Sequence, residues 1–254
     1  VRFYLASAYE EKGDTVTAIE EFRKIPPTAF NYTDALGHMA YLYLDSGEAE
    51  KGVALLREAI TADPTRFDLF LHLAGIYEGQ QKYREAMKVL TDVESNFQSD
   101  PRLHFRIGVL HDKLGEKEQL IERMKKTLAL TPDDPQALNY LGYTYVEMGV
   151  NLDEALQLLQ KATALRPNDG FILDSLGWAY YKLKRFRDAI AELERASELV
   201  ADDPTVKGHL ADAYLAVHDY RNALIMYKKL LQMEPGRKDI VDKIKRIRAE
   251  SGEK

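Results

Sequence analysis

The sequence contains no cysteine, which excludes disulfide bonds, thiolate zinc sites and cysteine nucleophiles. Its uninterrupted apolar runs are a few residues long, far short of the ~20 that cross a bilayer, so we expect no transmembrane segment. It also has no Gly-rich phosphate loop, no Gly-x-Ser-x-Gly elbow and no acidic calcium loop. These absences predict a protein that is not an enzyme and that holds no cofactor or metal.

The charge balance is slightly acidic. Of 254 residues, 35 are Lys or Arg and 41 are Asp or Glu, for a formal net charge of −6. A negative chain is a poor match for a phosphate backbone, so we expect no nucleic-acid partner. Hydrophobic residues make up 45% of the chain, which is ordinary for a folded protein and too apolar for a disordered one.

An apolar residue followed by a small one recurs at steps of 34 residues, with a single step of 35. The seven pairs are Leu5-Ala6, Met39-Ala40, Leu73-Ala74, Ile107-Gly108, Leu141-Gly142, Leu176-Gly177 and Leu210-Ala211. Three residues after the small one stands Tyr in six units and His111 in the fourth. The chain therefore consists of seven repeated units, and we number each unit so that the small residue is position 8.

Each unit has the pattern of two helices joined by a turn. Apolar residues at helical spacing precede a glycine in four units, at Gly13, Gly47, Gly115 and Gly149. Glycine adopts the left-handed conformation that ends a helix. Because such a hairpin cannot bury its own apolar face, consecutive units must stack. The pattern predicts an all-α fold.

These units resemble the tetratricopeptide repeat (TPR), a helix-turn-helix unit of 34 residues. The resemblance implies a right-handed α-solenoid of about seven units over residues 1-236, followed by a C-terminal capping helix and tail at 238-254. The expected units are approximately 1-32, 33-66, 67-100, 101-134, 135-169, 170-203 and 204-237. Within the family, the chain looks most like the C-terminal part of long bacterial multi-TPR proteins.

The fourth unit and the C-terminal segment depart from the repeat. In the fourth unit, His104 replaces a large apolar residue and His111 replaces Tyr. Leu120 replaces a small residue, and Thr127 stands where a small or apolar residue is usual. We therefore expect less regular packing in this unit. After the last unit, Ile residues at 240, 244 and 247 form one apolar face opposite a basic face. We interpret this segment as a cap; the alternative is a basic helix that binds nucleic acid or anionic lipid.

Two histidines share position 6 of their units, and each follows an acid by four residues. These are His38 after Asp34 and His72 after Asp68. Because neither His-x-x-x-His nor Glu-x-x-His occurs, we interpret them as surface pairs on a helix and not as a metal or general-base site.

The family resemblance implies that the first helices line a concave groove, with positions 2, 5, 9, 12 and 13 directed into it. The fifth and sixth units have the richest aromatic content at these positions, and Trp and Tyr are typical of interface hot spots. The predicted partner-binding residues are Asn139, Tyr143, Val146, Phe171, Asp174, Trp178, Tyr181 and Lys182. The alternative is that these aromatic side chains pack within the chain.

The predicted partner is a protein or peptide. The family's carboxylate clamp uses Lys, Arg and Asn in the groove. The corresponding positions 5 and 9 of the first units have no Lys and no Asn, so we do not expect such a clamp. Acids are frequent in the expected groove, so we predict an apolar partner segment with basic flanks. The groove acids are Glu10, Asp34, Asp45, Asp68, Glu78, Asp112, Asp174 and Asp212.

The function expected from the resemblance is a scaffold that binds a partner peptide or helix in the concave groove. Two alternatives remain: a self-assembling structural protein, or a regulatory module of a larger chain with its catalytic domain elsewhere. Residues 1 to 9 already have a helical pattern without an N-cap, so we expect a piece of a longer protein. The localisation is undetermined, with the cell envelope favoured over the cytoplasm by resemblance alone.

Overall fold

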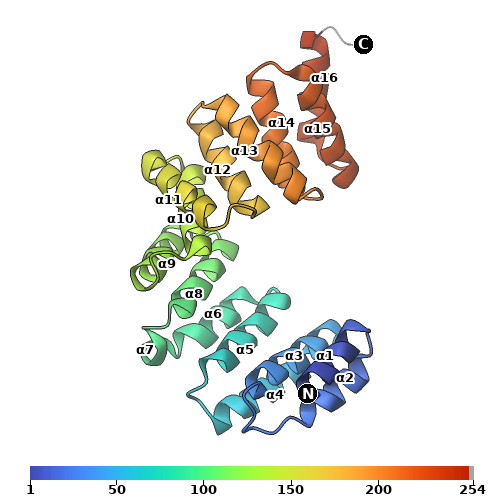
Figure 1. Cartoon of the computed structure of the whole chain (residues 1–254), viewed down its shortest axis with the longest axis vertical. Coiled ribbons are helices and arrows are strands. Elements are labelled where there is room, and N and C mark those ends of the chain that lie inside the picture. The colour runs from blue at the N-terminus through green and yellow to red at the C-terminus, as the bar shows by residue number, and fades with distance from the viewer. Residues whose placement is uncertain (252–254) are drawn as a thin grey trace. The chain divides into compact units, whose positions relative to one another are not determined.

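The computed structural model describes residues 1-251, and the last three residues of the expected C-terminal tail lie outside them. Within the described residues the fold is all-α, with sixteen helices and no strand (Figure 1). This confirms the predicted fold class. None of these helices combines the length and apolarity needed to cross a membrane.

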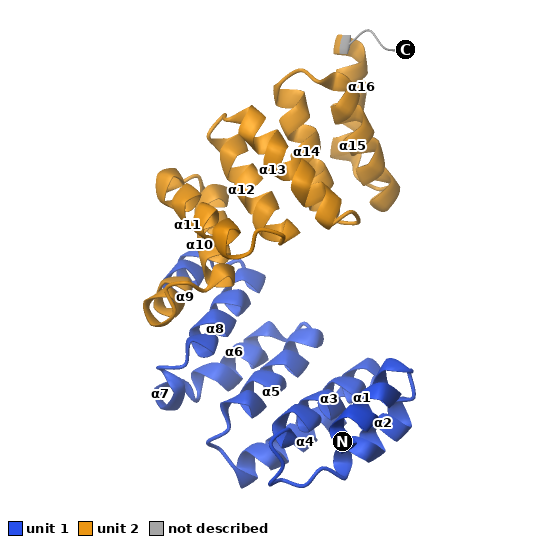
Figure 2. Cartoon of the chain, viewed as in Figure 1, with its two compact units in different colours: residues 1–123 blue, residues 124–254 orange. Residues whose placement is uncertain are grey.

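The chain divides into two compact units, Val1–Arg123 and Met124–Lys254 (Figure 2). The first contains α1 (Arg2–Glu11), α2 (Thr15–Arg23), α3 (Tyr32–Asp45), α4 (Ala49–Ala62), α5 (Phe67–Gly79), α6 (Tyr83–Thr91), α7 (Glu94–Phe97) and α8 (Pro101–Lys113). The second contains α10 (Pro135–Met148), α11 (Leu152–Leu165), α12 (Gly170–Lys182), α13 (Phe186–Leu199), α14 (Pro204–Ala216), α15 (Tyr220–Met233) and α16 (Lys238–Ser251). The division falls inside α9 (Lys117–Leu130), in the fourth repeat.

Aspartates begin the first helices of the later repeats. Asp134, Asp169 and Asp203 are N-caps whose carboxylates accept backbone N–H groups of the first helical turn. Pro135 and Pro204 follow two of these caps, where the missing proline N–H has no intrahelical partner to lose. These three repeats therefore have a defined start for their first helix.

A residue with positive φ ends the first helix of every repeat. Position 15 has φ between 58° and 80° in all seven repeats: Gly13, Gly47, Gln81, Gly115, Gly149, Lys184 and His218. The four glycines were predicted to take this conformation, and the structure confirms it. Gln81, Lys184 and His218 take the same conformation with a side chain, which costs roughly 1–2 kcal/mol.

The small residue at position 8 permits the two helices of a hairpin to lie close together. A Cβ atom on Gly142 would lie 2.8 Å from Leu159 Cγ, and one on Gly177 would lie 2.6 Å from Leu193 Cγ. Ala6, Ala40 and Ala74, at the same position, are fully buried. In the second compact unit, α10, α12 and α14 each pack against their hairpin partners, and α12 also packs against both α10 and α14.

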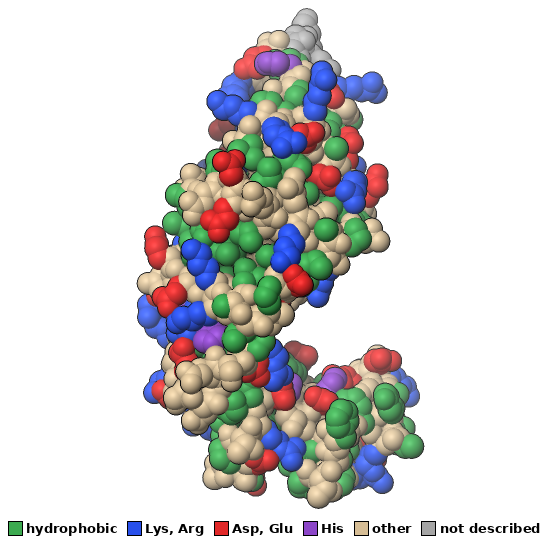
Figure 3. All heavy atoms as spheres, turned by 60° about the vertical axis from the view of Figure 1, so that its left-hand side comes forward, with side chains coloured by type: hydrophobic (Ala, Val, Ile, Leu, Met, Phe, Trp, Pro, Cys, Tyr) green, Lys and Arg blue, Asp and Glu red, His purple; other side chains and the backbone are tan. Residues whose placement is uncertain are grey.

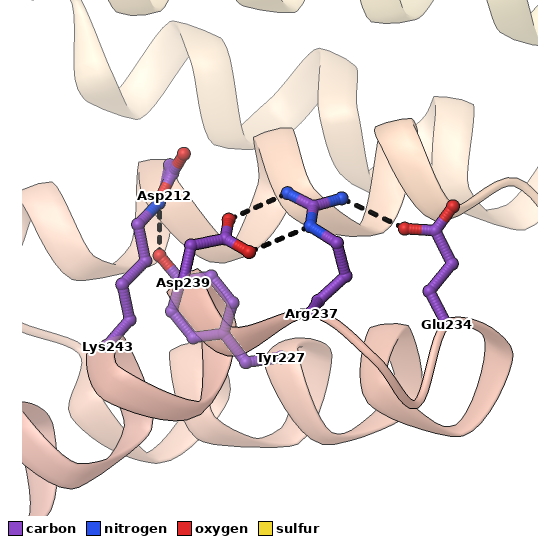
Figure 4. Close-up of polar contacts among 6 residues, drawn as sticks. All are labelled: Asp212, Tyr227, Glu234, Arg237, Asp239 and Lys243. Atoms are coloured by element: carbon purple, nitrogen blue, oxygen red, sulfur yellow. Dashed lines mark hydrogen bonds and ion pairs between the residues drawn. The ribbon is translucent and has the colours of Figure 1, made fainter.

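The last helix covers the C-terminal end of the second compact unit. α16 buries Ile240, Ile244 and Ile247, so the apolar face predicted for the cap is packed. Polar contacts anchor this helix, as Figure 4 shows. Lys243 Nζ lies 2.5 Å from Asp212 Oδ1, and the Tyr227 hydroxyl donates to the same carboxylate.

The fourth repeat buries three of the four residues that depart from the pattern, and the fourth, His111, is half-buried. Leu120 and Thr127 are fully buried, and His104 is 5% exposed with its Nε2 2.8 Å from the carbonyl oxygen of Gln98. Gln98 is the C-cap of the additional short helix α7. Less regular packing of this repeat stays a prediction.

Replacing Lys184 with Gly should raise the free energy of unfolding by about 1 kcal/mol, because Gly takes the left-handed conformation without strain at Cβ. Gly149→Ala is the matched control and should lower it by about the same amount. A Cβ on Gly149 would meet nothing within 4 Å, so the effect would come from the backbone alone. Thermal unfolding followed by circular dichroism measures both, and shifts of the same sign would contradict this account.

Candidate interaction surface

Six side chains from three neighbouring first helices meet in the second compact unit. Trp178 of α12 is at their centre, and we call this group the Trp178 cluster. Its members are Glu147 from α10, Asp174, Trp178, Tyr181 and Lys182 from α12, and His209 from α14.

The Trp178 ring is held by contacts on several sides. It stacks with the Tyr181 ring at 4.6 Å between centroids and 4° between planes, and with the His209 ring at 4.0 Å and 13°. The ammonium of Lys182 lies 4.9 Å from the ring centroid. The indole N–H donates to Glu147 Oε1 over 2.7 Å. The ring is thus half-buried and fixed in orientation by two neighbouring repeats.

Asp174 is the buried member of the cluster and is 6% exposed. Its carboxylate accepts from His209 Nδ1, at 2.9 Å and 3.0 Å to the two oxygens. A buried carboxylate needs such a partner, since burial of an unpaired charge is costly. Burial raises the pKa of Tyr181, and the carboxylate of Asp212 raises it further, so the phenol remains a hydrogen-bond donor above its usual pH range.

Four predicted site residues are brought together here: Asp174, Trp178, Tyr181 and Lys182. Phe171 lies on the same helix, seven residues before Trp178, and is 59% exposed.

The three predicted residues of α10 are not part of this group. Tyr143 and Asn139 are half-buried, and Asn139 Oδ1 is buried without a hydrogen-bond partner among the described residues. Val146 is 1% exposed, so it contributes to packing and not to an accessible surface. The two interpretations of the aromatic stretch, an accessible partner surface and packing within the chain, therefore apply to different residues. Phe171 and Lys182 are exposed, whereas the Trp178 ring also packs within the chain.

His209 was not predicted as a site residue, because it is at position 6 and not at an expected groove position. The available signal was that His38 and His72 are at the same position of their repeats. In the first compact unit, side chains at position 6 also pair with acids of another first helix. His38 Nδ1 lies 2.7 Å from Glu10 Oε2, and Arg106 Nε lies 2.7 Å from Glu78 Oε1. The expected pair of His38 with Asp34 on one helix is corrected by this contact with Glu10.

Most of the acids predicted to line the groove have a basic partner within the chain. Besides the pairs already described, Arg102 Nη1 lies 2.5 Å from Asp68 Oδ1 and Lys117 Nζ lies 2.6 Å from Asp112 Oδ1. Six of the eight acids are paired in this way: Glu10, Asp68, Glu78, Asp112, Asp174 and Asp212. The negative field of these helices is consequently weaker than the sequence indicates.

The wider surface has mixed charge. On the face drawn in Figure 3, acidic and basic side chains are interspersed, without the basic stripe typical of nucleic-acid-binding domains. Among the described residues, no group of three or more His, Asp or Glu side chains could hold a metal ion.

Family models described as tetratricopeptide repeat match residues 43–104, 105–170 and 151–213. Two curated relatives are similar over most of this chain. TPR repeat-containing protein PA4667 of Pseudomonas aeruginosa is 26% identical over 211 residues, covering 83% of the chain and 35% of the relative. TPR repeat-containing protein YpiA of Bacillus subtilis is 23% identical over 252 residues, covering 97% of the chain and 58% of the relative. The chain thus spans about a third and somewhat more than half of these relatives.

Solved structures show the same fold. The Cut9–Hcn1 hetero-tetramer of the APC/C contains a chain that matches with a TM-score of 0.76 at 20% identity, covering 95% of this chain and 48% of that one. PilF of Pseudomonas aeruginosa matches with a TM-score of 0.70 at 17% identity, covering 86% of this chain and 97% of PilF. At these identities the likeness concerns the fold alone.

His72 provides a pH test of packing between first helices. Burial over Gly37 lowers its pKa, although the carboxylates of Asp68 and Asp34 oppose the shift and His38 adds to it. The unfolded chain therefore binds a proton at higher pH than the folded chain, and stability falls as pH drops below about 6.5.

His72→Gln should lose less thermal stability than the wild type between pH 7 and pH 5, by a melting-temperature margin on the order of 2 °C. His218→Gln, which removes an exposed imidazole, is the control and should follow the wild type. An equal pH dependence of the melting temperature in wild type and His72→Gln would show that burial of His72 does not contribute to the loss of stability at low pH.

Proposed function

The chain belongs to the tetratricopeptide repeat family, and from this premise we propose that it is a non-enzymatic scaffold that binds a partner protein in the groove of its first helices. The proposed contact surface is the exposed side of α12 together with the Trp178 cluster. A chain of the same fold in the Cut9–Hcn1 hetero-tetramer occurs together with a second protein, which supports this class of function.

The observation that carries the proposal is the stripe along one side of α12. Phe171, Trp178 and Lys182 are spaced by seven and four residues, so they lie along one helical face. Phe171 is 59% exposed, Lys182 is exposed and Trp178 is half-buried. A rigid aromatic ring that is already oriented loses little entropy when a partner covers it.

The chemistry of the partner follows from this stripe. Phe171 and the accessible edge of Trp178 favour an apolar segment, as does the shortage of unpaired acids nearby. Glu147 is exposed and accepts its hydrogen bond from the neutral indole of Trp178, so its negative charge remains available to a basic flank. We therefore propose an apolar peptide or helix with a basic residue positioned near Glu147.

Recovery of interacting proteins tests this surface. Phe171→Ala and Lys182→Glu should each reduce recovery of the partner by at least tenfold, as loss of an interface anchor costs ~2 kcal/mol. Their melting temperatures should remain within about 2 °C of wild type, since both side chains are exposed. Ile225→Ala on α15 is the matched control, because Ile225 is 39% exposed and outside the stripe.

The comparison is made by affinity capture from lysate followed by quantitative mass spectrometry. A captured set that is unchanged by Phe171→Ala and Lys182→Glu would remove α12 as the binding surface. A set reduced equally by Ile225→Ala would show that the recovery does not report on this surface.

Self-association is a second candidate, favoured by the first hairpin. Position 7 is buried in every later repeat, with Met39, Leu73 and Leu210 at most 4% exposed, whereas Leu5 is 46% exposed. Tyr4 and Val16 on the same hairpin are 77% and 70% exposed. These residues have the composition of a stacking surface, so another helical hairpin would cover them, and self-association is the case in which a second copy of the chain supplies that hairpin.

Light scattering across concentration tests this candidate. The wild type should gain mass between micromolar and submillimolar concentrations, and Leu5→Glu should remain monomeric because it places a charge in the apolar contact. Glu11→Lys, an exposed change of charge on α1, should behave as wild type. A monomer at all concentrations would exclude a second copy as the occupant.

A further inference from the structure

A cavity of about 750 Å³ lies between α13, α14 and α15, and none of its lining residues belongs to the Trp178 cluster. This volume is within the range of small-molecule sites, roughly 300–1,000 Å³. Leu210, Met226 and Met233 provide an apolar wall. Lys207 and Lys229 provide two ammonium groups.

Lys207 is at a position that is otherwise part of the core. It is position 4 of the seventh repeat, where other repeats have the buried residues Leu36, Phe70, Leu138 and Leu173. Lys207 is likewise buried, at 5% exposed. A lysine where the fold requires an apolar residue reduces stability, and such exceptions are expected mainly at functional sites.

The charge of Lys207 is not matched by a carboxylate at hydrogen-bond distance. Its ammonium donates to the carbonyl oxygen of Ser197 at 3.0 Å and to Ser197 Oγ at 2.5 Å, both neutral acceptors. An ammonium has three N–H donors, so one donor remains for a ligand. Burial lowers the pKa of Lys207, and the positive charge of Lys229 lowers it further, while Asp202 and Asp203 act in the opposite direction.

The acids of the cavity limit which anion can enter. The Tyr214 hydroxyl donates to Glu194, so this carboxylate is already engaged. Glu198 and Asp202 also line the cavity, and both are exposed. With Glu194, these carboxylates outnumber the ammonium groups of Lys207 and Lys229, so the lining opposes a dianion more strongly than a single carboxylate held at Lys207.

We propose that this cavity binds a small amphiphilic monocarboxylate. The carboxylate accepts hydrogen bonds from Lys207 and Lys229, and an unbranched apolar chain lies along Leu210, Met226 and Met233. Flexible methionine side chains adapt to such a chain without one fixed shape. This site is independent of the partner surface on α12.

Methionine methyl groups report directly on the site. The chain has six methionines, of which only Met226 and Met233 line the cavity, and Met39, Met87, Met124 and Met148 are internal controls. With ¹³C-methyl methionine labelling, hexanoate should shift the Met226 and Met233 signals saturably and leave the other four unchanged. Hexanol, which lacks the charge, and adipate, which has two, should each bind at least tenfold more weakly.

Lys207→Met should reduce hexanoate affinity at least tenfold and should fold, because this position is apolar in most other repeats. Lys228→Met removes an exposed neighbouring charge that does not line the cavity, and it should bind as wild type. Three results would each overturn the proposal: Met226 and Met233 signals that do not move, equal binding of hexanol, or unchanged affinity in a folded Lys207→Met.

Discussion

The fold depends on one constraint: a single helical hairpin of this chain cannot bury its own apolar residues. Positions 3 and 7 of a first helix become buried when the preceding repeat packs on them, as Ala35 and Met39 do in one core cluster with Ala6, Ala18 and Phe22 of the first repeat. Stability is therefore shared between neighbours, and each repeat contributes both a core and an interface.

This constraint also determines where the chain is free to vary. Positions 7 and 8 are occupied by core and small residues because two helices meet there, and position 15 must take a positive φ to turn the chain. Positions 5, 6, 9, 12 and 13 lie where consecutive first helices meet each other and solvent. Charged and aromatic residues collect at these positions: Glu10 with His38, Glu78 with Arg106, and Asp174 with His209.

The sequence predicts the features that are set within one repeat better than the contacts between repeats. The period of 34 residues was sufficient for the helices and the four glycine turns, because those features depend on residue type within one repeat. It was not sufficient for Lys184 and His218, whose positive φ is imposed by the turn and not by their side chains. Contacts between repeats were the hardest to predict. His209 belongs to the cluster because α14 places it over Trp178, and Glu10 pairs with His38 across two helices, so neither contact has a fixed spacing within one helix.

Two polar residues at position 4 show how the same exception has different physical outcomes. His104 is buried in the fourth repeat, where the Gln98 carbonyl at the end of the additional helix α7 satisfies its Nε2. The end of the third repeat supplies this acceptor, so local structure accounts for the buried histidine. Lys207 is buried to the same extent, but its ammonium donates to the neutral oxygens of Ser197. An imidazole N–H needs a single acceptor, whereas an ammonium has three N–H donors and a charge to compensate. The lysine is therefore the polar core residue whose presence is better explained by a ligand than by the fold.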